Sequence, residues 1–181
     1  MNKILLIRKM ISVISSTNRK GNQTAVFSQN CLEFIKQKNQ KATAFNLDQL
    51  PGELSIENMY DFGNSTFSEI SNQVIEPAEK FLFVIPEYNG SFPGILKLFV
   101  DAIHPKHFKG KKAALIGVAS GRAGNLRGMD HMADILNHLG VLVMPNKLPV
   151  SGLDRLIEEG KLTDQETLNL LEQHIDQFIS F

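Results

Sequence analysis

Apolar runs of strand length alternate with longer stretches of helical spacing along most of this chain. The runs lie at 10–15, 42–47, 81–85, 112–119 and 141–144. Short apolar runs joined through helices are typical of βαβ units, in which the strands are parallel and helices cover both faces of the sheet. The pattern therefore predicts an α/β three-layer sandwich whose five-stranded parallel sheet has the order 2-1-3-4-5.

The helices expected between these runs begin at recognisable residues. Thr163 and Glu166 have capping-box spacing, so the last helix is expected to start there. Ser91 is the expected N-cap of the helix that follows Pro93. The predicted helices cover residues 23–38, 68–75, 93–103, 126–139 and 163–180.

Composition favours one domain over residues 1–181. The chain is 43% hydrophobic, enough for one substantial core, and no Pro/Gly/Ser-rich stretch divides it. Its 19 basic and 19 acidic side chains cancel, which gives no electrostatic support for a nucleic-acid or anionic-membrane partner.

The polar stretch at 48–67 interrupts the alternation of strands and helices and is expected to be a long loop near the carboxyl edge of the sheet. Such a loop would serve as a substrate lid or a subunit contact, or it would be an insertion without a function.

The amino terminus and the cysteine count bear on location. Residues 1–7 are too short an apolar stretch for a signal peptide or a membrane span, so we expect a cytoplasmic protein without a membrane anchor. Residues 1–9 extend the first strand or form a frayed tail. Cys31 is the single cysteine and lies among apolar residues at helical spacing, as a core residue would. The scattered histidines and one cysteine predict no metal site.

Three polar, glycine-bearing loops follow strands one, three and four. They lie at 15–24, 86–94 and 119–125. Because these strands are neighbours in the expected order, their loops are expected to meet in one crevice at the carboxyl edge. The first loop places hydroxyl, amide and cationic side chains at a helix start, which suits a phosphate. An ordinary N-cap with a solvated basic turn is the alternative, because neither common nucleotide-binding glycine pattern is present.

The residues of these loops resemble the NADPH-dependent FMN reductase family, over residues 10–148. The resemblance implies a flavodoxin-like fold, non-covalently bound FMN, and a homodimer or homotetramer. The family usually has glycine where this chain has Ser16 and serine where it has Asn22. The matching residues are Thr17-x-Arg19 with Asn22 and Thr24, then Pro86-Glu87-Tyr88-Asn89-Gly90-Ser91-x-Pro93-Gly94, then Ser120-Gly121-Arg122.

Carried over by position, the resemblance implies a cofactor site with three parts. Thr17, Arg19, Asn22, Gln23 and Thr24 would hold the FMN phosphate; Pro86, Glu87, Tyr88, Asn89 and Gly90 would wrap the isoalloxazine; Ser120, Gly121, Arg122 and Gly124 would flank its pyrimidine side.

The implied reaction passes a hydride from NADPH or NADH to flavin N5 and then electrons to a small-molecule acceptor. The acceptor is free flavin, a quinone, an azo compound or a metal ion. No side chain is expected to act as a general base. Arg122 is expected to supply positive field near the ring, Tyr88 to contact the ring or a subunit interface, and Glu87 to be structural.

Two other classes of function stay open. A flavodoxin-like electron carrier would bind FMN without a nicotinamide, although such carriers are typically acidic and this chain is neutral. A binding module would keep the fold and lose the flavin.

Overall fold

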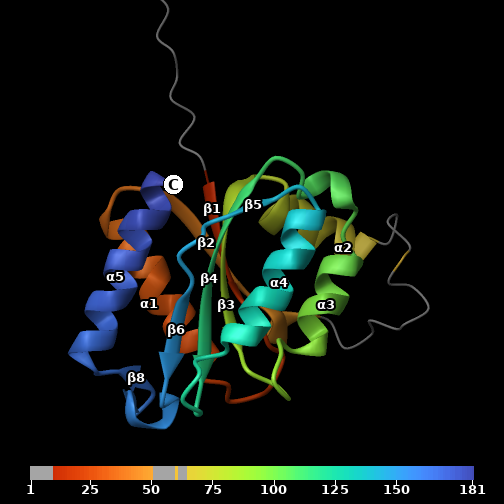
Figure 1. The fold of residues 1–181 in the computed structure, drawn as a ribbon. Coiled ribbons are helices and arrows are strands. Elements are labelled where there is room, and N and C mark those ends of the chain that lie inside the picture. Colours follow the sequence, from red (N-terminus) through yellow and green to blue (C-terminus); the bar gives the residue numbers. More distant parts are fainter. Residues whose placement is uncertain (1–9, 51–59, 61–64) are drawn as a thin grey trace, which may run out of the picture.

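A parallel sheet runs through the middle of the computed structural model, which describes residues 10–50, 60 and 65–181 (Figure 1). Its strands follow the order β2-β1-β3-β4-β5, which confirms the predicted 2-1-3-4-5 sheet. The predictions for residues 1–9 and for most of the 48–67 loop lie outside the described residues. The strands are β1 (Met10–Ser15), β2 (Lys41–Asn46), β3 (Ala78–Pro86), β4 (Lys112–Ala119), β5 (Leu142–Val143) and β6 (Leu148–Ser151).

The fifth position of the sheet is shared by two short strands. β5 pairs with the first residues of β4, starting at Lys112↔Leu142, and β6 pairs with its last residues. Pro145 lies between the two strands and has no N–H to donate to a ladder. The prediction of a single strand over 141–144 was therefore wrong in extent, because half of the fifth position lies at 148–151.

Helices cover both faces of the sheet and complete the three-layer sandwich (Figure 1). On one face lie α1 and α5, and on the other lie α3 and α4. α2 continues into a π-helical turn, Ser71–Ile75, in which Glu76 N donates to Ser71 O over 2.8 Å. The helices are α1 (Thr24–Gln37), α2 (Ser65–Ile70), α3 (Gly94–Asp101), α4 (Leu126–His138) and α5 (Gln165–Ser180).

The central strand β3 explains why this arrangement is stable. Its side chains alternate between the two layers: Phe83 and Ile85 pack toward α3 and α4, whereas Leu82 and Val84 pack toward α1 and α5. All four are completely buried. Burying a side chain of this size contributes roughly 1.5–3 kcal/mol, so a strand that is apolar on both faces is strongly held between two helical layers.

The helices start within three residues of the predicted positions, and two of the predicted N-caps were wrong. α5 is capped by Asp164, whose Oδ2 accepts from Thr167 N over 2.8 Å, so the predicted capping box at Thr163 was wrong. α3 begins after Pro93 without a side-chain cap. The predicted cap, Ser91, instead places its Oγ 2.8 Å from Nδ1 of His131 on α4.

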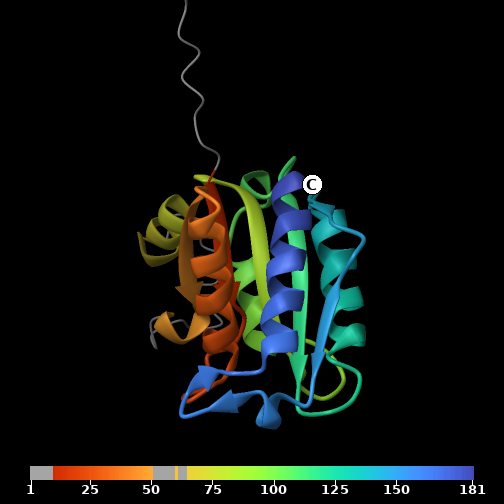
Figure 2. The same cartoon turned by 90° about the vertical axis from the view of Figure 1, so that its left-hand side faces the viewer.

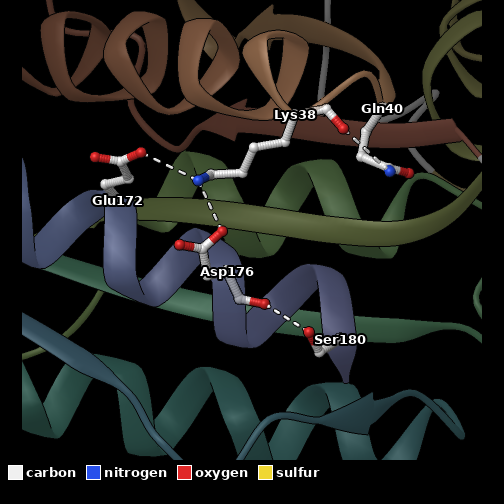
Figure 3. A network of polar contacts seen from close by, with 5 residues as sticks. All are labelled: Lys38, Gln40, Glu172, Asp176 and Ser180. Carbon is white, nitrogen blue, oxygen red and sulfur yellow. Dashed lines mark hydrogen bonds and ion pairs between the residues drawn. The ribbon is translucent and has the colours of Figure 1, made fainter.

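Polar contacts join α1 to α5 outside the core. Lys38, just beyond α1, lies 3.1 Å from Glu172 Oε1 and 2.7 Å from Asp176 Oδ1, as Figure 3 shows. The hydrogen bond with Asp176 is the main reason that the pKa of Lys38 is raised. These contacts join the end of α1 to the middle of α5, in addition to the buried core that the two helices share.

The chain between β6 and α5 forms structure that the sequence pattern did not predict. A 3-10 turn, η4 (Leu153–Arg155), leads into an antiparallel hairpin of β7 (Ile157–Glu158) and β8 (Lys161–Leu162). Leu162 is buried in the same core layer as α1 and α5. In both cartoon views the hairpin lies beside the start of α1 (Figures 1 and 2).

Candidate functional site

A cavity of about 390 Å³ opens at the carboxyl edge of the sheet, where the three polar loops meet. This volume lies within the roughly 300–1,000 Å³ of typical small-molecule sites. Eight of the predicted site residues line it: Arg19, Asn22, Gln23, Thr24, Pro86, Glu87, Tyr88 and Ser120. Its other lining residues are Lys20, Gly21, Val118, Ala119, Leu153 and Asp154.

The first loop is folded tightly onto the start of α1. Asn22 donates from Nδ2 to Arg19 O over 2.8 Å, and its Oδ1 accepts from Ala25 N over 3.1 Å. Gly21 allows the turn because its φ is +67°. Asn22 thus organises the loop and satisfies one of the first amides of the helix.

Backbone N–H groups remain available at this helix start. Val26 N donates to Gln23 O over 3.1 Å, but the amides of Gln23 and Thr24 have no acceptor within the described part of the chain. Both residues line the cavity. Unpaired amides at a helix N-terminus, beside the exposed cations of Arg19 and Lys20, suit an anion.

Thr17 lies behind the cavity and joins the first loop to the second. Its Oγ1 is 2.8 Å from Tyr88 OH, and it also accepts from Arg19 N over 3.2 Å. Thr17 is completely buried and does not line the cavity. Its hydroxyl therefore positions Tyr88 and the backbone of Arg19.

The second loop forms a two-residue hairpin. Tyr88 N and Ser91 N donate to each other's carbonyl oxygens over 2.9 and 3.0 Å. Between them, Asn89 and Gly90 have φ values of 51° and 77°, as a type I′ turn requires. Neither Asn89 nor Gly90 lines the cavity. The turn holds Tyr88 at its base, where this half-buried residue lines the cavity.

Arg127, on α4, packs against this hairpin. Its Nη2 lies 4.0 Å from Glu87 Oε1, and a Cβ atom on Gly90 would lie 3.4 Å from the same nitrogen. The Arg127 side chain is 76% exposed, so the ion pair is weak. Glu87 is held mainly through its backbone, because its N–H donates to Val118 O over 3.0 Å.

The third loop contacts the cavity through Ala119 and Ser120, and its later residues are bound to the fold. Gly124, with φ +56°, packs so closely on β6 that a Cβ atom there would lie 2.6 Å from Pro149 Cβ. The carbonyl of Arg122 accepts from Ser151 Oγ over 2.7 Å, and its side chain is exposed. Gly121, Arg122 and Gly124 therefore do not line the cavity.

Two lining residues, Leu153 and Asp154, come from a fourth loop that the sequence prediction missed. They follow β6 directly, so they obey the same rule as the other loops: a ligand site lies where parallel strands end. The signal was hidden because the strand preceding them was not predicted.

The cysteine, possible metal ligands and the helices of the described residues bear on what this chain can do. Burial raises the pKa of the Cys31 thiol to about 12, so Cys31 is a packed core residue without thiolate reactivity. Among the described residues, no three His, Cys, Asp or Glu side chains lie close enough together to hold a metal ion. Nor does any helix in the described ranges have the length and apolar character needed to cross a membrane.

Comparison with known proteins identifies the class of protein that this fold and cavity define. A family model described as NADPH-dependent FMN reductase matches residues 10–153. The chain belongs to this family, which confirms the resemblance seen in its loops. It is a flavin-dependent oxidoreductase whose cofactors are FMN and NAD(P)H.

Particular relatives span most of the chain. An NAD(P)H-dependent FMN reductase of Pseudomonas aeruginosa is 33% identical over 124 residues, which cover 66% of this chain and 67% of that protein. An FMN-dependent NADPH-azoreductase of Staphylococcus aureus is 27% identical over 180 residues, covering 93% of each. The flavoenzyme FerB of Paracoccus denitrificans, an NAD(P)H:(acceptor) oxidoreductase, has the same fold with a TM-score of 0.76, at 22% identity and 95% and 96% coverage.

Proposed function

We propose that this chain binds FMN in the carboxyl-edge cavity, where NAD(P)H reduces it, and that electrons then pass to a small-molecule acceptor. The observation that carries the proposal is the anion site at the start of α1. The unpaired amides of Gln23 and Thr24 and the cations of Arg19 and Lys20 share one cavity with the loops after β3 and β4.

The cavity fits the two ends of FMN chemically. The phosphate would accept from the amides of Gln23 and Thr24 and pair with Arg19, because a helix N-terminus and a guanidinium both favour a dianion. The ring system would lie between Tyr88 and Ser120, which line the cavity from the second and third loops. Thr17 would not touch the phosphate. It would hold Tyr88 in place through the 2.8 Å contact with its hydroxyl.

FMN, when bound, supplies a hydride acceptor that can return electrons to a second substrate. The chain's own residues then need only orient the partners and exclude side reactions. The N–H groups of Asn89 and Gly90 would donate to ring heteroatoms if the hairpin lies along the ring edge. Arg122, exposed on the third loop, would add positive field near a reduced, anionic ring. No side chain is assigned a proton transfer.

The acceptor that we propose is a small conjugated molecule, such as free flavin, a quinone or an azo compound. The Staphylococcus aureus relative, named as an azoreductase, supports this class. We also propose that the protein acts as a cytoplasmic homo-oligomer. An oligomer is supported by the exposed side chain of Leu126, 47% accessible, at the start of α4 directly after the third loop.

The test is a visible absorption spectrum of the purified protein after FMN is added and excess flavin removed, followed by anaerobic addition of NADPH and NADH. Retained flavin that loses its absorbance promptly, and regains it when a quinone or azo compound is added, is the expected result. Retained flavin that neither nicotinamide can bleach would favour the electron carrier. No binding in a flavin titration would remove the proposal for this cavity.

A further inference from the structure

Two carboxylates line the candidate flavin cavity, and their surroundings differ. Glu87 lies beside Arg127. Asp154 is exposed, and within the described ranges no lysine, arginine or histidine nitrogen lies within 4.0 Å of its carboxylate. Asp154 therefore presents an uncompensated negative charge to the same cavity as Arg19 and Lys20.

The fold holds the backbone of Asp154 on both sides. Before it, β6 is paired with β4 as far as Ala119↔Ser151. Around it, Arg155 N donates to Gly152 O over 2.9 Å, where Gly152 supplies a φ of +67°. After it, Thr163 N donates to Leu156 O over 3.0 Å and closes the hairpin loop. The backbone that carries Asp154 is therefore held in place at the cavity.

The hairpin that follows Asp154, β7 with β8, lies beside the first helix. β8 packs against the start of α1, and both views place it there (Figures 1 and 2). Asp154 itself lines the same cavity as the unpaired amides of Gln23 and Thr24, where a flavin phosphate would lie. A carboxylate that shares a cavity with a phosphate dianion opposes the attraction of Arg19 and Lys20, and the repulsion weakens with salt.

We propose that Asp154 lowers the affinity of the site for the flavin phosphate, so that FMN exchanges readily and is only modestly preferred over riboflavin. The inference rests on the proposed function, because it concerns the same cavity. Asp154 is a specificity-determining residue here: it acts on the phosphate, the one group that distinguishes FMN from riboflavin.

The test is flavin fluorescence titration of the wild type and Asp154→Asn with FMN and with riboflavin. Asp154→Asn is expected to lower the Kd for FMN about fivefold at low salt and to change the Kd for riboflavin less than about twofold. The gain for FMN is expected to shrink at about 0.5 M salt. The rate of FMN release, followed by stopped-flow fluorescence, is expected to fall in parallel.

Glu158→Gln is the matched control, because Glu158 is an exposed carboxylate in the hairpin that follows Asp154 and does not line the cavity. It is expected to leave both Kd values unchanged. Asp154→Ser tests the same charge if the amide variant folds poorly. Equal changes in the Kd for FMN and riboflavin would overturn the inference while the proposed function stands. Weaker FMN binding by Asp154→Asn and Asp154→Ser would do the same. Binding of neither flavin to the wild type would overturn both.

Discussion

The two edges of the sheet use positive charge in opposite ways. At the amino edge, Lys80 donates to Phe178 O and Ile179 O over 3.0 and 2.8 Å, and Lys111 donates to Glu76 O over 3.1 Å. These carbonyls lie at or just beyond helix C-termini, where a cation is favourable. At the carboxyl edge, Arg19 and Lys20 are exposed, and no carboxylate of the described residues lies within 4.0 Å of them. Cations that are already paired stabilise the fold, whereas unpaired cations beside unpaired amides are available to a ligand.

A buried ionisable side chain tests this comparison most severely, because its charged form has neither a hydrogen-bond partner nor water. His174 on α5 is 2% exposed, and neither ring nitrogen has a hydrogen-bond partner in the described part of the chain. Burial lowers the pKa of His174 from 6.5 to about 4. At a pH between these two values, unfolding is therefore accompanied by the uptake of a proton. The stability that neutral His174 contributes is fully present above about pH 6.5, and the free energy of unfolding falls as the pH drops below that value.

The loss is expected to approach about 3 kcal/mol near pH 4. Chemical denaturation as a function of pH measures it, with His174→Leu as the comparison variant, whose free energy of unfolding should fall less steeply over this range. Parallel pH profiles for the two proteins would show that His174 is not the group responsible.

At the amino edge, Lys80→Met is expected to lower the free energy of unfolding by about 2 kcal/mol, because it removes a charged donor from two carbonyls at the end of α5. The Kd for FMN should not change. Urea denaturation and flavin titration measure the two quantities. Lys41→Met is the control, since Lys41 is exposed at the start of β2. A change in FMN affinity without a change in stability would contradict the comparison.

At the carboxyl edge, the reverse is expected for Arg19→Ala. The Kd for FMN should rise about tenfold, because a charge-assisted contact to the phosphate is lost. Stability should hardly change, since the Arg19 side chain is exposed. Arg122→Ala should raise the Kd less, because Arg122 does not line the cavity. Equal losses in the two variants, measured by flavin fluorescence titration, would refute the assignment of Arg19 to the phosphate.

The smallest effect on flavin affinity is expected at the two-residue hairpin of the second loop, between Tyr88 and Ser91. Replacing Asn89 and Gly90 together with alanine puts a β-carbon at the positive φ of residue 90 and removes from residue 89 a side chain that tolerates positive φ; a left-handed alanine costs roughly 1–2 kcal/mol. Since the turn lies at the surface, we expect it to shift with the fold intact and to raise the Kd for FMN about fivefold. Circular dichroism checks the fold, and titration checks the affinity. Unchanged affinity would show that the hairpin does not approach the flavin.

The sequence predicted the fold well where hydrophobic pattern alone decides it. β3 and β4 are apolar on both faces, so their position in the middle of the sheet followed from the pattern. The fifth strand was only half found, because Pro145 and Pro149 interrupt the apolar run and partial exposure replaces full burial there. Short edge strands carry little periodicity, and pairing with β4 is what defines them.

The candidate site was predicted where the chemistry of single loops is distinctive, and it was missed where the preceding strand was not found. Residues of the first and second loops could be placed because turn and cap chemistry marks them, as at Asn22 and at Asn89-Gly90. Leu153 and Asp154 depended on the unpredicted end of the fifth strand. The burial of Thr17 could not be read from the sequence either, because it results from a contact with Tyr88, which lies 71 residues away.

The divided fifth strand has a consequence for the behaviour of the protein in a crowded solution. An uninterrupted strand at the border of a sheet offers a row of N–H and C=O groups to which another chain can add, and this is a common start of aggregation. Here the border is broken between Val143 and Leu148, and Pro149 removes one more donor within β6. The break that made the strand hard to predict also makes it a poor template for association with other polypeptides.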